Sequence, residues 1–134
     1  MTMGALGIVE AWQLAVNRGS ATDAATLMAE QVQVSGPRGD GLMPRHELGA
    51  WMVRSGFTAE PLRWFCGGNG TVVIEQDARW VDRKTGQDRG RAVVASLFRV
   101  DDDVVSRVVR HDQGLQAALD SAGLVGADEV LNRA

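Results

Sequence analysis

Tyrosine is absent from this 134-residue chain, and cysteine and lysine each occur once, as Cys66 and Lys84. A single cysteine cannot form an intrachain disulfide, which is typical of proteins from reducing compartments. No apolar run approaches the roughly 18 residues of a membrane span, and the first residues lack the basic start of a secretory signal. We therefore expect a cytoplasmic protein without a membrane segment.

The chain also lacks a strong charge of either sign. Its formal net charge is -3, and the basic residues, almost all arginine, are interleaved with acidic ones. Neither a nucleic acid nor an anionic membrane is therefore expected as a partner. A hydrophobic content of 45% and a charged content of 23% are those of an ordinary globular protein, and the length fits one domain.

Helical spacing of apolar residues dominates the first half of the chain. The predicted elements, in order, are a helix over 5–18, a short helix capped by Ser20, a strand over 31–35, a loop over 36–42 and a helix over 44–55. Gly56 is expected to end the last of these helices, because glycine favours the left-handed conformation that closes a helix. Gln13 falls largely off the apolar stripe of the first helix.

From residue 61 onward the apolar period changes from 3.6 to 2, which predicts four antiparallel strands. Turns are expected near residues 67–70, 82–90 and 101–103, and the Asn-Gly pair in the first is a strong hairpin signal. Asp112 is expected to cap a final helix that Gly123 closes. Helices segregated from an antiparallel meander indicate an α+β fold, and long strands can curl around a helix to leave a cone with an apolar mouth.

Four stretches resemble the nuclear transport factor 2-like superfamily, and its SnoaL-like group in particular. They are WQLAVNRG at 12–19, the predicted helix at 44–52, the long strand at 72–80, and FRVDDDVVSRVVRHD at 98–112. The resemblance implies a cone-shaped curved antiparallel sheet wrapped around the N-terminal helices, as in cystatin-like proteins. It implies one domain over residues 1–134, with a core at about 5–122 and a tail at 123–134.

The resemblance also implies a pocket inside the cone, but no known catalytic set of the superfamily matches. Isomerase-type and dehydratase-type sites use tyrosines, which this chain lacks. The epoxide hydrolase relay needs inward Arg and Asp where this sequence has Gln76 and Ala78. With two histidines and one cysteine, no metal-ligand spacing is present, and no cofactor is expected. No residue is therefore assigned a catalytic role, and enzymatic activity is left open.

The pocket residues follow from which side of each strand faces the helices. In the register that the resemblance implies for 72–80, the inward set includes Ile74, Gln76 and Trp80, and Gln76 is either a hydrogen-bonded structural residue or a ligand contact. Both faces of 104–111 are apolar, so periodicity cannot orient that strand, and a one-residue slip would exchange its faces. The resemblance places Arg107 and His111 inward, roughly 13 Å apart. The expected ligand-binding residues are Trp12, Trp51, Trp64, Gln76, Trp80, Phe98, Arg107 and His111.

Three hypotheses for function remain. The first is a small-molecule binding protein with a mostly apolar pocket for a hydrophobic ligand. The alternatives are an isomerase, cyclase or hydrolase of SnoaL-like type, and a non-catalytic homodimerisation module. A homodimer through the outer sheet face is expected in any case, because the strand over 91–100 is apolar on both faces and helices were expected to cover only one.

Overall fold

The computed structural model describes residues 4–36 and 39–131 of the chain. Its elements are α1 (Ala5–Asn17), α2 (Ala21–Ala25), β1 (Met28–Gly36), β2 (Gly39–Pro44), the 3-10 turn η1 (Arg45–Glu47), α3 (Leu48–Ser55), β3 (Phe57–Cys66), β4 (Thr71–Val81), β5 (Asp88–Asp101), β6 (Val104–His111), α4 (Leu115–Ala122) and the 3-10 turn η2 (Gly126–Asp128). Among the described helices, none has the length and hydrophobicity that a membrane crossing requires.

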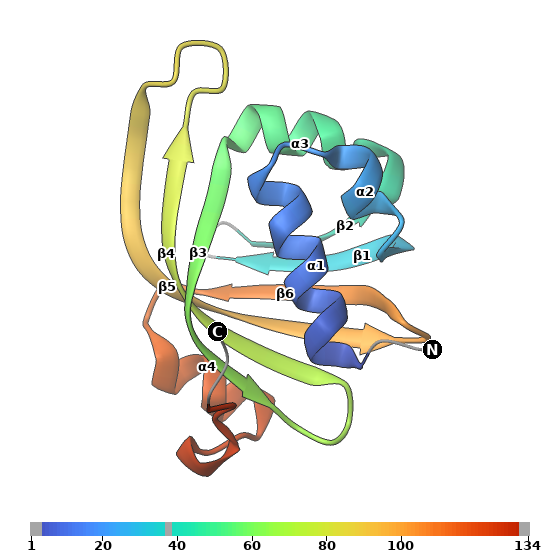
Figure 1. The fold of residues 1–134 in the computed structure, drawn as a ribbon, viewed down its shortest axis with the longest axis vertical. Helices are drawn as coiled ribbons and strands as arrows, with labels where there is room; N and C mark the ends of the chain where they lie inside the picture. The colour runs from blue at the N-terminus through green and yellow to red at the C-terminus, as the bar shows by residue number, and fades with distance from the viewer. Residues whose placement is uncertain (1–3, 37–38, 132–134) are drawn as a thin grey trace.

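The six strands form one curved, unclosed sheet in the order β2-β1-β6-β5-β4-β3 (Figure 1). The predicted α+β class, the meander from β3 to β6 and its three turns are confirmed. All neighbouring strands are antiparallel except β1 and β6, which run parallel. Part of the predicted loop over 36–42 is instead β2, which pairs with a longer β1; Pro37 and Arg38 lie outside the described residues.

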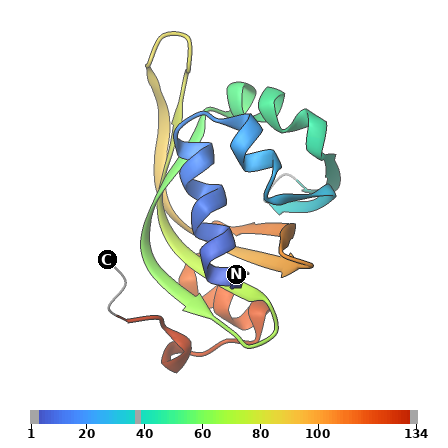
Figure 2. The same cartoon turned by 45° about the vertical axis from the view of Figure 1, so that its right-hand side comes forward.

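The first three helices pack against the concave face of the sheet (Figure 2). The apolar stripe of α1 explains its position, since Ile8, Trp12 and Ala15 are each at most 3% exposed. Ser20 caps α2 as expected, its hydroxyl accepting the amide hydrogen of Asp23 at 3.3 Å. The helices do not fill the concave side completely, and a cavity remains that α1 and α3 help to line.

The fourth helix covers the convex face instead. Ala118 and Leu119 of α4, followed by Leu124, pack against an apolar patch of the sheet that includes Ala95 and Leu97. This face of β5 was expected to pack on a second subunit, and that reason for dimerisation is wrong, because the chain's own α4 lies there. The expected Asp112 cap of α4 is also wrong: Gly114 occupies the N-cap without a side-chain bond.

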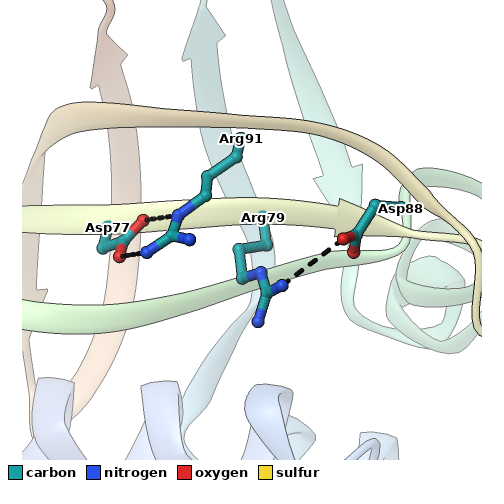
Figure 3. A network of polar contacts seen from close by, with 4 residues as sticks. All are labelled: Asp77, Arg79, Asp88 and Arg91. Carbon is teal, nitrogen blue, oxygen red and sulfur yellow. Dashed lines mark hydrogen bonds and ion pairs between the residues drawn. The ribbon is translucent and has the colours of Figure 1, made fainter.

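Charged side chains occupy the part of the convex face next to β4 and β5 beyond this patch. Asp77 and Arg91 form a two-pronged ion pair with N–O distances of 3.0 and 2.6 Å, and Arg79 reaches Asp88 at 3.4 Å (Figure 3). Val93, on the same face, is 58% exposed. A homodimer stays a prediction, now restricted to this uncovered area.

A β-bulge in β6 sets the orientation that sequence periodicity could not resolve. Arg99 pairs with Arg107 whereas Val100 pairs with Val105, so β6 carries one extra residue, Ser106, at this point. Val105 and Val108 both pack with the concave core as a result. Neither of the two strictly alternating faces considered for residues 104–111 therefore persists along the strand.

Candidate functional site

A cavity of about 750 Å³ lies between the concave face, α3 and the end of β1. Its lining comes from every part of the cone: Trp12 and Gln13 of α1; Val34, Ser35, Gly36 and Gly39 of β1 and β2; Trp51, Arg54 and Ser55 of α3; Phe57, Gln76 and Trp80 of β3 and β4; Arg89, Ser96 and Phe98 of β5; Val108 and Arg110 of β6. This volume lies within the range of small-molecule sites.

Five aromatic side chains belong to the wall of the cavity. Trp12 and Phe98 meet edge to face with ring centroids 5.6 Å apart. Phe57 lies between two tryptophans, 6.0 Å from Trp51 and 5.8 Å from Trp80. These separations are typical of favourable aromatic pairs, which fix ring orientations and give the wall a defined shape.

A chain of hydrogen bonds crosses the inner part of the cavity. The Ser96 hydroxyl donates to Gln76 Oε1 at 2.7 Å, and Gln76 Nε2 donates to Gln13 Oε1 at 3.0 Å. All three side chains are at most 3% exposed. Unpaired amides would be costly at this depth, so the bonds hold the strand and helix residues in one arrangement. Gln76 is thus both a structural residue and a cavity residue.

The chain of bonds continues out of the cavity to the edge of the sheet. Gln13 Nε2 donates to Asn17 Oδ1 at 3.0 Å. Asn17 in turn binds the backbone of Ala59 twice, accepting from its amide at 2.9 Å and donating to its carbonyl at 2.8 Å. The last turn of α1 is therefore attached to β3 by side-chain bonds, which fixes the position of Trp12 above the sheet.

One buried donor in the wall has no partner. The indole Nε1 of Trp12 is inaccessible to solvent and finds no acceptor within the described residues. An unpaired buried N–H typically costs about 1–3 kcal/mol, and most such groups in folded proteins are paired with protein or with water.

Arginine is the one charged residue type in the described lining. Arg110 has its guanidinium 5.2 Å from the centre of the Trp80 ring, and its Nε donates to Asp112 at 2.9 Å. Arg89 Nη1 donates to the backbone carbonyl of Arg54 at 3.4 Å. Arg54 and Arg89 are exposed and Arg110 is half-buried, which places the three cations toward the solvent side of the cavity.

Five of the eight expected residues line this cavity: Trp12, Trp51, Gln76, Trp80 and Phe98. Trp64 is buried in the core but lies outside the lining, as does Ile74, its partner across β3 and β4. Ile74 precedes Trp80 by six residues, about 20 Å along a strand, so Trp64 lies far from the open end of the cone.

The expected inward position of Arg107 and His111 is wrong. His111 pairs with Ala95, and Arg107 pairs with Arg99. Ala95 faces the convex side, where it packs in the cluster under α4, and residues 107 and 111 lie on that same side of the sheet. The half-buried His111 has an Nε2 atom without a partner in the described residues, while Arg107 is exposed. Arg110, the residue before His111, lines the cavity instead, together with Arg54 and Arg89.

The lining includes residues that the sequence did not predict, among them Gln13, Arg54 and Arg89. Gln13 was expected to lie off the buried stripe of its helix. It is buried nevertheless, because its side chain forms a hydrogen bond with the buried side chain of Gln76. Arg54 and Arg89 follow no periodic pattern, because one ends a helix and the other lies on a strand next to a long turn. Only the three-dimensional curvature of the sheet brings these two arginines together.

The lining offers little acid–base chemistry. Among the described residues that form it, none is an aspartate, glutamate, histidine, tyrosine or cysteine. Cys66 lies elsewhere, at the end of β3, where burial and the charge of Asp128 raise the pKa of its thiol and favour the less nucleophilic protonated form. Within the described ranges, no cluster of His, Cys, Asp and Glu has the geometry of a metal site.

Solved structures of other proteins share this architecture at low sequence identity. An NTF2-like protein of unknown function from Cytophaga hutchinsonii superposes with a TM-score of 0.70 at 14% identity, over 83% of this chain and 91% of its own. A proposed polyketide cyclase from Xanthomonas campestris pv. campestris gives a TM-score of 0.65 at 22% identity, over 79% and 87% of the two chains. TerC, co-crystallised with polyporic acid, gives 0.64 at 12% identity, over 88% and 96%.

No protein-family model and no curated protein matches the sequence itself. The likeness therefore rests on the curved sheet, the helices in its concave face and the coverage of more than three quarters of each chain reported above. The chain has the nuclear transport factor 2-like fold, the fold that its sequence resembles.

Proposed function

We propose that this protein binds a small, largely apolar molecule in the cavity of the cone and does not transform it by acid–base chemistry. The observation that carries the proposal is the cavity itself: about 750 Å³ of space whose lining includes five aromatic side chains. A cavity that served only folding would be filled by its own side chains, because interiors pack densely and voids destabilise.

The composition of the wall supports binding over catalysis. A general base needs a carboxylate, histidine or similar group within hydrogen-bond reach of the substrate, and the described lining has none. The polar groups of the inner wall are bonded to one another, since the Ser96 hydroxyl donates to Gln76 and Gln76 donates to Gln13, so neither side chain is poised to act on a ligand. A small organic molecule has also been co-crystallised with one protein of this fold, TerC.

Binding is tested with N-phenyl-1-naphthylamine, an uncharged aromatic probe that fluoresces when it enters an apolar site. The wild-type protein is expected to give saturable binding with one site per chain. Val108→Trp fills the cavity and should abolish the signal, whereas Val93→Trp, on the exposed convex face of β5, should retain it. Circular dichroism checks that both variants fold, and Ser35→Trp replaces Val108→Trp if the latter does not.

Saturable binding that only the cavity-filling variants lose would support the proposal. No saturable binding by the wild type, or equal binding by Val108→Trp and Val93→Trp, would contradict it.

A further inference from the structure

Arg110 is held at the cavity in an arrangement that leaves its outer nitrogens available. Its guanidinium lies on the Trp80 ring at 5.2 Å, and Asp112 accepts from Nε at 2.9 Å. The two terminal nitrogens form no hydrogen bond within the described residues. A guanidinium has five N–H donors in a planar fork, so both of these nitrogens retain donors for another acceptor.

The contacts on either side of this guanidinium restrict its motion. A cation over an indole face is attracted by the negative charge density of the ring, and more strongly where water is excluded. With 29% of its side chain exposed, Arg110 is partly shielded from solvent. A positioned, partly desolvated fork of this kind binds carboxylates and related oxyanions through two parallel hydrogen bonds.

Two further arginines add positive charge to the same side of the cavity. Arg54 and Arg89 both line it, and the Arg89 side chain is tied to the Arg54 backbone. The backbone N–H of Lys84, and to a smaller extent the charge of Arg89, lower the pKa of the Asp82 carboxyl, but Asp82 is outside the lining. Asp112 is likewise outside it. The described wall therefore presents three cations and no anion, which favours a negatively charged guest.

We infer that the ligand of this cavity is a planar hydrophobic acid: an aromatic or similarly flat body against the tryptophans, with a carboxylate or sulfonate on Arg110. This inference rests on the proposed function, since it specifies the class of molecule that the cavity binds. Arg54 and Arg89 attract the anion without a fixed contact, and Arg110 fixes its position.

The test compares two probes that share one aromatic body. 8-Anilino-1-naphthalenesulfonate carries a sulfonate, and N-phenyl-1-naphthylamine is the same molecule without it. Dissociation constants are measured by fluorescence at two salt concentrations for the wild type, for Arg110→Gln and for Arg107→Gln. Arg107 is the matched control because it lies on the same strand but on the convex parity, exposed and outside the cavity.

The wild type is expected to bind the sulfonate at least about tenfold more tightly than the neutral probe, and less tightly at high salt. Arg110→Gln should remove most of that preference while leaving the neutral probe's affinity unchanged, and Arg107→Gln should change neither. Equal affinity for the two probes, or a sulfonate preference that survives Arg110→Gln, would overturn the inference while leaving the proposed function intact. Failure of both probes to bind would overturn both.

Discussion

Gln76 Nε2 donates to Gln13 Oε1 at 3.0 Å, joining the centre of the sheet to the helix that lies inside it. The two residues are 63 positions apart in sequence and are both buried. This bond places a polar pair in the apolar interior of the cone, beside the aromatic wall of the cavity. Each of the two side-chain amides has a further hydrogen-bond partner: Ser96 donates to Gln76, and Gln13 donates to Asn17.

Replacing either glutamine by leucine should destabilise the fold by about 1–3 kcal/mol, because the other glutamine is left buried without its partner. The double variant Gln13→Leu/Gln76→Leu should lose less than the sum of the two single losses. Free energies of unfolding from urea titration give all three values. Strict additivity would show that the two amides do not depend on one another.

Gly56 ends α3 in the left-handed conformation, at φ 64°, as the sequence predicted. A methyl group on this residue would overlap the carbonyl oxygen of Val81, so the end of β4 would have to move. Gly56→Ala should therefore destabilise the protein by about 3 kcal/mol or more.

The control for Gly56 is Gly86→Ala in the β4–β5 turn. Gly86 also has a positive φ, 75°, but no atom lies near its added methyl group. Its loss should be limited to the left-handed backbone cost of about 1–2 kcal/mol. Equal losses from the two variants, measured by thermal denaturation, would argue against the close approach at Val81.

The variant Leu97→Arg tests whether α4, rather than a second subunit, covers the convex face of β5 at this residue. Leu97 is 5% exposed and packs in the cluster beneath α4, so a buried unpaired charge there should cost about 3 kcal/mol or more. Val93→Arg, at a site 58% exposed, should leave the stability of the chain within about 0.5 kcal/mol.

Light scattering at micromolar concentration then reports on assembly. A homodimer through the uncovered convex face would become a monomer in Val93→Arg without loss of folded structure. A monomeric wild type would rule that dimer out, and a Leu97→Arg variant as stable as the wild type would contradict the packing of α4.

The ion pair between Asp77 and Arg91 predicts a lowered pKa for the Asp77 carboxyl. Hydrogen bonds from Arg91, aided by its charge and that of Arg79, lower the pKa of the Asp77 carboxyl. A lowered folded pKa stabilises the fold above the unfolded value, near 4, and that stabilisation is lost as the pH falls through the folded value. NMR titration should give Asp77 a pKa below its ordinary value in the wild type and one closer to it in Arg91→Gln. An unchanged pKa in that variant would contradict the ion pair.

The order of elements in this fold follows from local signals. Periods of 3.6 and 2, the Asn69–Gly70 turn and the glycines that end α3 and α4 act over a few residues, so sequence alone locates them. The position of α4 does not follow from such signals. Its apolar stripe could cover either face of the sheet or a partner, and only the complementary patch around Leu97 decides between them.

The site was predictable where residue parity is regular. Strand β4 alternates without interruption from Val72 to Trp80, so its inward residues could be read from the sequence. Strand β6 contains a bulge. Because both faces of this strand carry two valines each, the apolar pattern does not reveal the bulge. Arg110 was therefore assigned to the wrong face together with its neighbours Arg107 and His111.

The central claim, that the cavity binds a small apolar molecule, is tested most directly by fluorine NMR of the protein labelled with 5-fluorotryptophan. The chain has four tryptophans, of which Trp12, Trp51 and Trp80 line the cavity and Trp64 does not. Single Trp→Phe variants assign the four resonances. On saturation with N-phenyl-1-naphthylamine, the three cavity resonances should shift and the Trp64 resonance should stay in place. Four unmoved resonances, or a shift confined to Trp64, would contradict the claim.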